Sequence, residues 1–496
     1  MLFNSYEFIF IFLPVTLVLF FLIGARGHHK IAMTWLVGAS LFFYGWWNPA
    51  YLGLIMASML FNYGLGVGLG SGTQVQRKAI LIAGIIINLS LIGYFKYANF
   101  FVDNLNSAFD SSIHLELIIL PLAISFFTFQ QITYLVDAYK GDTKEYDFLH
   151  YCLFVTFFPQ LIAGPIVHHK EMMPQFSKKS IYFLNYNHLA IGLTIFLLGL
   201  FKKVVIADSF ALYATPVFEL AESGGSLTFF KAWGGALAYT FQLYFDFSGY
   251  SDMAIGLARM FGIKLPFNFN SPYKAVNIID FWRRWHMTLS RFLRDYVYIP
   301  LGGNKKGKSR RYINLMLTML LGGLWHGAGW TFVAWGGLHG FYLMVNHGWR
   351  ALRKKMGMDL TKQTLPGVIL STGVTFIAVV VSWVFFRAES FTAGMHIIVA
   401  MLDISSATGI NSSNIAKFHI LFILLAFLIV WFIPNTQRIV TEGKYKAGKF
   451  RYKWQAYFNN KLSWQPGIVW GLIVGVIFTF TLILLERKSE FLYFQF

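Results

Sequence analysis

The chain has 496 residues, of which 56% are hydrophobic and 13% are charged, and its formal net charge is +19. Soluble domains carry roughly 25% charged residues, so this composition excludes an ordinary soluble fold and predicts a polytopic membrane protein. The basic residues stand in short clusters between apolar runs. Positive-inside topology explains that pattern without a nucleic-acid interface, and we expect no nucleic-acid partner.

Long apolar runs recur along the chain, and each is long enough to cross a hydrocarbon core of about 30 Å as a helix. The clearest runs cover residues 8–24, 31–47, 79–95, 118–136, 365–386 and 467–485. With the runs that Gly and Pro interrupt, they predict an all-α fold with roughly ten to twelve membrane-embedded helices. Neither a soluble segment nor an internal repeat stands out, which predicts one membrane domain over residues 1–496.

Basic residues near the first apolar runs predict the topology. Arg26 and Lys30 follow the first run, whereas residues 47–51 after the second run carry no charge. We therefore expect the N-terminus outside and Arg26 inside the cell. The first run has no basic segment before it and no small-residue cleavage site after it, so we expect it to remain as a span.

Two carboxylates, Asp246 and Asp252, interrupt the apolar run 236–257. Six residues apart on one helix, they point in different directions, which disfavours a paired-carboxylate acid and base site. They are candidates for lining a polar tunnel or for bonding broken backbone, and the structural role is the simpler interpretation.

The segment 282–296 has bulky apolar residues at helical spacing and arginines on the opposite side, which predicts one amphipathic helix at the cytoplasmic interface, against lipid headgroups. His286 lies at the edge of its apolar arc. A basic, glycine-containing stretch, 301–311, follows. The candidates for binding phosphates, of a coenzyme or of a lipid headgroup, are Arg283, Arg284, Arg291, Lys305 and Lys306. Topology and loop flexibility explain these cations more simply, because no phosphate-loop motif is present.

Two histidines, His326 and His339, stand inside the apolar run 313–344, where ionisable groups are costly and tend to be functional. Four glycines and the neighbouring Trp325 surround His326, so a substrate chain or a second backbone could approach it closely. Tight helix packing is the alternative explanation. Because the two histidines are 13 positions apart, an unbroken helix would turn them to different faces. We expect no catalytic metal.

Several motifs together resemble the membrane-bound O-acyltransferase family, in particular its bacterial branch that serves alginate O-acetylation. They lie at residues 93–100, 158–165, 244–252, 281–286, 293–296, 301–304, 323–327 and 491–496. The resemblance therefore covers nearly the whole chain, and the block from Phe281 to Gly327 is the most specific part of it.

The resemblance implies that His326 is the catalytic residue inside a membrane tunnel and that His286 is the second, more cytoplasmic family histidine. It implies a cytoplasmic thioester donor, acetyl-CoA in the alginate-type branch, and no bound cofactor. The acetyl group would pass to periplasmic or extracellular acetyltransferase partners and reach a polysaccharide such as alginate. The protein would lie in the bacterial cytoplasmic (inner) membrane.

Other functions remain open on the sequence. Within the same family, peptidoglycan O-acetylation and D-alanylation of teichoic acid are alternatives, and the second would use a carrier-protein thioester in place of acetyl-CoA. A polysaccharide or lipid-linked transporter, or a scaffold for polysaccharide assembly, is the alternative of another class. A transporter would be expected to show inverted repeats with paired broken helices, which the sequence does not display.

Overall fold

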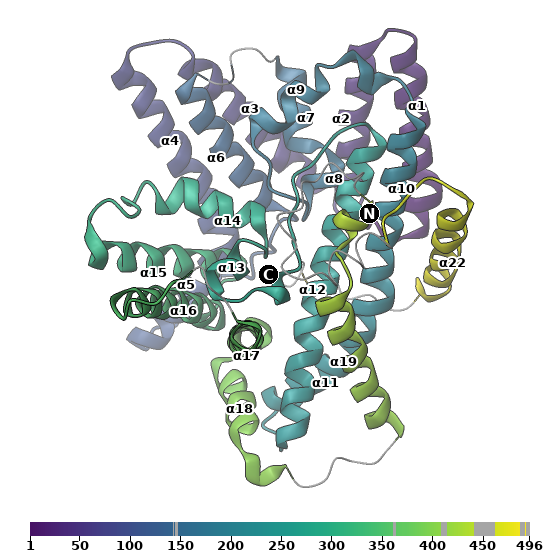
Figure 1. Cartoon of the computed structure of the whole chain (residues 1–496). Helices are drawn as coiled ribbons and strands as arrows, with labels where there is room; N and C mark the ends of the chain where they lie inside the picture. Colours follow the sequence, from purple (N-terminus) through teal and green to yellow (C-terminus); the bar gives the residue numbers. More distant parts are fainter. Residues whose placement is uncertain are drawn as a thin grey trace. The chain divides into compact units, whose positions relative to one another are not determined.

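The computed structural model describes residues 1–141, 143, 147–360, 364–407, 414–440, 462–486 and 492 (Figure 1). Every regular element within these ranges is a helix or a helical turn. The expected all-α fold is thereby confirmed for the described part of the chain. Most of the C-terminal motif at 491–496 lies outside the described residues.

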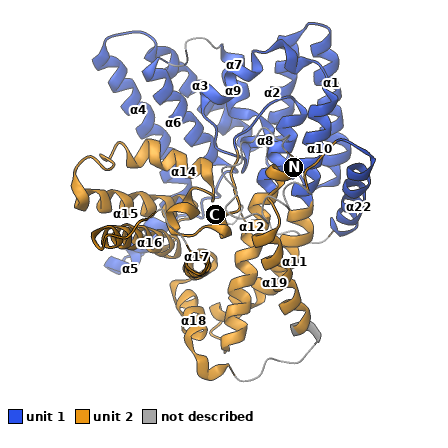
Figure 2. Cartoon of the chain, viewed as in Figure 1, with its two compact units in different colours: residues 1–200, 250–266, 466–485 blue, residues 201–249, 267–465, 486–496 orange. Residues whose placement is uncertain are grey.

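The chain forms two compact units, each made of segments that are distant in sequence (Figure 2). Unit 1 comprises residues 1–200, 250–266 and 466–485, and unit 2 comprises residues 201–249, 267–465 and 486–496. The long helix α12 (Phe229–Met260) contributes its first part to unit 2 and its last part to unit 1. One membrane domain over the whole chain stays a prediction.

Unit 1 contains the N-terminal helices, the end of α12 and a late helix. Its elements are α1 (Leu13–Ala25), α2 (His29–Gly45), α3 (Ala50–Leu69), α4 (Gln74–Ile92), α5 (Ala98–Phe109), α6 (Ile124–Lys140), α7 (Phe148–Thr156), α8 (Phe158–Leu161), α9 (His169–Phe176), most of α10 (Tyr186–Phe201) and α22 (Ile468–Leu484). Helices α10 and α12 approach closely at Gly192 and Gly256, where an added Cβ on either residue would lie 2.6 Å from the other's carbonyl oxygen. Such contacts between small residues are typical of helix packing in membranes.

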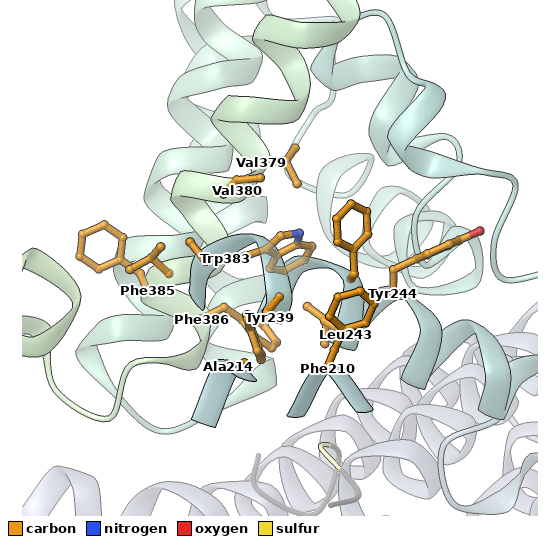
Figure 3. Packing of buried hydrophobic residues seen from close by; sticks show 14 of the residues in the cluster. Phe210, Ala214, Tyr239, Leu243, Tyr244, Val379, Val380, Trp383, Phe385 and Phe386 are labelled. Atoms are coloured by element: carbon orange, nitrogen blue, oxygen red, sulfur yellow. The ribbon is translucent and has the colours of Figure 1, made fainter. Parts of the chain in front are cut away.

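Unit 2 contains the elements that carry most of the predicted site residues. They are α11 (Asp208–Glu222), the first part of α12, α13 (Ile278–Trp282), α14 (Met287–Leu293), α15 (Gly307–His326), α16 (Trp330–Lys355), α17 (Leu365–Arg387), α18 (Phe391–Leu402), α19 (Asn414–Phe432) and α20 (Thr436–Val440). Its hydrophobic core joins side chains of α11, α12 and α17, among them Phe210, Tyr239 and the fully buried Trp383 (Figure 3).

Helices α15 and α16 form a hairpin whose two backbones lie close together. A Cβ on Gly323 would overlap the carbonyl oxygen of Phe332, and one on Gly336 would overlap that of Met319. The hairpin turns between His326 and Trp330, so its tip carries the predicted catalytic histidine. Gly323, one of the glycines that the sequence places around His326, therefore permits this close packing. A functional role for the glycine-rich surroundings of His326 stays a prediction.

Five helices in the described part of the chain are long and apolar enough to cross a membrane, and three shorter apolar helices accompany them. The five cover Phe8–Ala25, Ala50–Leu69, Gln74–Phe109, Tyr186–Glu222 and Leu365–Arg387. Many of their large apolar side chains are exposed, for example Ile86 and Leu89 on α4. Exposed apolar surface on such helices suits contact with lipid. The protein is multi-pass, and a total of ten to twelve embedded helices stays a prediction.

Candidate active site

The first part of the candidate site is built around His286 and the side chain of Asn268. His286 is fully buried, and its Nδ1 lies 3.0 Å from Asn268 Oδ1. The same oxygen accepts hydrogen bonds from the hydroxyl of Thr288, at 2.9 Å, and from its backbone N–H, at 3.3 Å. Because a backbone N–H can only donate, this amide atom is the acceptor, and Nδ1 of His286 must carry the proton.

The opposite ring nitrogen of His286 is therefore the basic one. Nε2 is buried and has no hydrogen-bond partner within the described ranges. Burial lowers the pKa of His286 to about 3, so the imidazole is neutral at physiological pH. A neutral ring with a fixed tautomer and a lone pair at Nε2 can accept a proton or a hydroxyl hydrogen bond.

The backbone at His286 has an uncommon conformation, with φ of 40° and ψ of 55°. The break it makes between α13 and α14 pairs with the extended segment after α12. Met287 N–H donates to Asn268 O and Asn270 N–H donates to Arg284 O, each at 2.9 Å. A non-glycine residue in the left-handed region costs free energy and persists where its surroundings hold it, often at functional sites.

This break corrects the sequence-based expectation of one amphipathic helix over 282–296. The segment consists of α13, a break at residues 283–286, α14 and a π-helical turn, Arg294–Tyr298. The apolar period continues through the break because Trp285 and Leu289 are both buried, so periodicity alone could not reveal it.

His326 lies in the same unit as His286. It ends α15, is 6% exposed, and lies among aromatic rings of Trp325, Trp335 and Phe386 at centroid distances of 4.9, 5.1 and 5.0 Å. The rings of His286 and His326 are 6.5 Å apart. That separation is too long for a direct hydrogen bond between the rings. Two imidazoles therefore lie side by side in a mainly aromatic, water-poor environment.

His339 takes a structural position next to this site. Its Nε2 lies 3.0 Å from Ser382 Oγ, which itself donates to the carbonyl oxygen of Val379 at 2.8 Å. Trp335 lies between the two histidines of the hairpin, 5.1 Å from His326 and 4.8 Å from His339. The helix between them is broken, so the expectation that rested on an unbroken helix does not apply. Among the described residues, no three His, Cys, Asp or Glu side chains form a cluster that could hold a metal ion.

The two candidate carboxylates of α12 are both buried and belong to different units. Asp246, in unit 2, forms an ion pair with Lys203, which also bonds Asp208 at 2.8 Å. All three side chains are almost fully buried. Asp252 belongs to unit 1 and is 1% exposed. Trp325 packs against His326 and is 7% exposed. A tunnel-lining role for these three residues stays a prediction.

The five candidate phosphate-binding cations differ in their surroundings. Arg284 is engaged inside the protein, because its Nε bonds Asp280 at 2.9 Å and its Nη1 donates to Asn270 O at 3.2 Å. Arg283, Lys305 and Lys306 are exposed, and Arg291 is half-buried. The exposed three remain able to meet a ligand, whereas Arg284 stabilises the break beside His286.

Sequence reasoning missed Asn268, Thr288 and Lys203. Asn268 lies 18 positions before His286, in a segment without helical or strand periodicity, so no local pattern joins the two. Lys203 does carry a signal, because it is a cation inside the long apolar stretch Tyr186–Glu222, where an ionisable group is costly. These contacts are visible only in three dimensions.

Comparison with known proteins identifies the family of this chain and several relatives. The family model described as the membrane-bound O-acyltransferase family matches residues 136–386. The peptidoglycan O-acetyltransferase of Helicobacter pylori is 42% identical over 100% of this chain and 98% of its own length. The probable alginate O-acetylase of Azotobacter vinelandii is 42% identical over 87% of this chain and 84% of its own length. The teichoic acid D-alanyltransferase of Streptococcus thermophilus is 30% identical over 53% of this chain and 68% of its own length.

A helical, multi-pass protein with these similarities is an integral membrane acyltransferase. The chain belongs to the membrane-bound O-acyltransferase family, as its sequence motifs predict.

Proposed function

We propose that this protein transfers an acetyl group from a cytoplasmic thioester, acetyl-CoA, toward a polysaccharide outside the cytoplasmic membrane. The observation that supports the proposal most directly is the buried pair His286 and His326, 6.5 Å apart between centroids, in a member of an O-acyltransferase family. A base in a water-poor site suits acyl transfer because it activates a hydroxyl without promoting hydrolysis of the thioester.

In the proposed reaction, His326 removes the proton of the acceptor hydroxyl as its oxygen attacks the thioester carbonyl carbon. The new C–O bond forms, the C–S bond breaks, and His326 returns the proton to the departing thiolate. General base catalysis of this kind typically contributes about 10² to 10⁴ in rate. His286, with its lone pair at Nε2, has the supporting role of accepting a hydrogen bond from the reacting hydroxyl.

The exposed candidate cations are proposed to bind the acyl donor. Arg283, Lys305 and Lys306 are the candidates for holding donor phosphates on the cytoplasmic side, because charge-assisted hydrogen bonds to phosphate are strong. A carrier-protein thioester, as in teichoic acid D-alanylation, is the competing donor. Consumption of acetyl-CoA by purified membranes, compared with consumption of an acylated carrier, separates the two.

The proposed acceptor is a polysaccharide outside the cytoplasmic membrane. The two candidates are alginate or a related exopolysaccharide, and peptidoglycan. Relatives named for both substrates are 42% identical to the chain, so identity does not favour either. Partner acetyltransferases outside the membrane would complete the transfer.

The test measures acetyl esters in the secreted and wall polymers of a deletion strain. The strain is complemented with wild-type protein, His326→Ala or His286→Ala, each checked for equal abundance in the membrane. We expect esters to be lost from one polymer, which identifies the acceptor, and to be restored by wild type alone. Full restoration by His326→Ala would refute the proposed base and favour a scaffold.

A further inference from the structure

A basic cavity of about 240 Å³ lies in unit 1, at the end of the first membrane span. Three cationic side chains, Lys178, Arg259 and Lys264, line it, and none of its lining residues is acidic. Three positive charges around one cavity, without a carboxylate in its wall, favour an anionic ligand. None of the residues assigned to acyl transfer lines this cavity.

Several hydrogen bonds fix the shape of the cavity. The side chain of Gln175 bridges to the backbone of Lys264, accepting from its N–H at 2.8 Å and donating to its carbonyl oxygen at 3.0 Å. Gly262 turns the chain with a φ of 77°, a conformation that favours glycine. The loop between α12 and the next segment is thus held against α9, and the wall of the cavity is a built feature.

The start of α10 adds to the positive character of the cavity. Asn185 and His188 both line the cavity, and Asn185 Oδ1 caps the helix by accepting from the backbone N–H of His188 at 3.0 Å. The 16-residue helix α10 therefore begins at the cavity and brings the positive end of its dipole to it. The helix dipole and the three cationic side chains therefore both favour an anion in the cavity.

The position of the cavity and its apolar residues suit a lipid. Phe21 and Met260 provide apolar wall, and Phe21 belongs to the last turns of α1. Arg26 and Lys30, which follow Phe21, predict that this end of the span is cytoplasmic. An anionic headgroup at this level could meet the cations while its acyl chains follow the apolar residues into the bilayer.

We propose that this cavity binds a phosphate-bearing anion, and specifically the headgroup of an anionic phospholipid in the cytoplasmic leaflet. The site goes beyond acyl transfer, because it would tie the activity or stability of the enzyme to the anionic lipid content of the membrane. A soluble phosphate compound is the other source of the same chemistry, and the experiment separates the two.

The test uses the full chain, purified in detergent, and native mass spectrometry with added phosphatidylglycerol or phosphatidylcholine. The variant Lys178→Gln/Lys264→Gln removes two cavity cations and leaves intact the backbone atoms that bond Gln175. The matched control, Lys78→Gln/Lys179→Gln, removes two exposed lysines that do not line the cavity. Ser180→Trp fills the cavity without a change in charge. Adenosine 3′,5′-bisphosphate and inorganic phosphate are the soluble probes.

We expect wild type and control to bind phosphatidylglycerol in preference to phosphatidylcholine. The cavity variant should bind it roughly tenfold more weakly or worse, since each interfacial cation attracts anionic lipid appreciably. Ser180→Trp should also bind weakly. Equal binding by the cavity variant and the control would overturn the site. Binding of the soluble probes with no lipid preference would support a phosphate site and overturn its assignment to lipid. Acetyl transfer is measured separately, so failure of this proposal is distinguishable from failure of the proposed function.

Discussion

At the scale of single residues, the neutral amide of Asn268 decides the chemistry of His286. It accepts from Nδ1 without adding charge, so the buried imidazole keeps its lone pair at Nε2 and stays neutral. A carboxylate in the same place would favour the imidazolium form, because a nearby negative charge stabilises the protonated ring. The choice of amide over carboxylate thus sets both the tautomer and the charge of this histidine.

This role of Asn268 predicts the effect of two substitutions. Asn268→Ala removes the acceptor of Nδ1 and frees the tautomer, and we expect acetyl transfer to fall about 10- to 100-fold, within the range of positioning partners. Asn268→Asp keeps an acceptor oxygen but raises the pKa of His286 from about 3 toward neutrality. The rate of Asn268→Asp should then fall as the pH drops from 8 to 5, the direction in which His286 gains its proton. Initial rates with radiolabelled acetyl-CoA in membrane vesicles measure both effects.

The control for these variants is Thr288→Val, which removes the hydroxyl that bonds the same Oδ1 and leaves His286 bonded. It should retain most of the activity and the wild-type pH profile. If Asn268→Asp showed the wild-type profile as well, Asn268 would have a packing role and not a positioning role for His286.

Single residues also show what could be predicted from the sequence. His326 stands out because a histidine in an apolar run is costly. The structure places its ring 6.5 Å from that of His286. Asn268 gives no such signal, because a polar residue in a loop is ordinary. Its importance arises only when the chain folds to bring it to the imidazole, 18 positions further along the sequence.

At the scale of elements, the packing of α15 against α16 requires glycine where the two backbones come closer than most side chains allow. Two adjacent glycines of α16, Gly336 and Gly337, differ in this respect. A Cβ on Gly336 would overlap the backbone of Met319, whereas one on Gly337 would meet only the side chain of Leu320, at 3.8 Å. Gly336→Ala should destabilise the protein by about 1 to 3 kcal/mol, the typical cost of overpacking. Because His326 ends α15, the activity of Gly336→Ala should fall together with its stability.

Thermal unfolding in detergent, followed by size-exclusion chromatography of heated samples, checks this prediction. Gly337→Ala is the matched control, with the same change on the same helix, and should unfold near the wild-type temperature. An equal loss of stability in both variants would mean that helix propensity or lipid contact governs these positions, and not the close backbone approach.

Some elements can be predicted from the sequence pattern and others cannot. Apolar runs located the spans at 8–24 and 365–386 well, since hydrophobicity and length are enough to define a membrane helix. The prediction of one helix over residues 282–296 is wrong, because the apolar spacing continues across the break at His286. A positive φ held by contacts from a distant segment leaves no trace in periodicity.

At the scale of the whole molecule, the distribution of basic residues predicts how the chain crosses the membrane. Lys30 lies in the first turn of α2, and Ala50 begins α3 beyond the other end of α2. The 17 residues of α2 extend about 26 Å at 1.5 Å per residue, close to the thickness of the hydrocarbon core. Lys30 and Ala50 are both exposed, and Cys152, the one cysteine of the sequence, is 6% exposed. Maleimide labelling of single introduced cysteines can therefore read the topology against an unlabelled wild type.

We expect Ala50→Cys to react with an impermeant maleimide in intact spheroplasts, and Lys30→Cys to react only after permeabilisation, because the charged end of α2 stays in the cytoplasm. The same result would place the basic cavity at the cytoplasmic leaflet, where anionic headgroups are available to it. The reverse pattern would put Arg26 and Lys30 outside, contradict the positive-inside assignment, and require the proposed lipid site to be reassigned to the opposite surface.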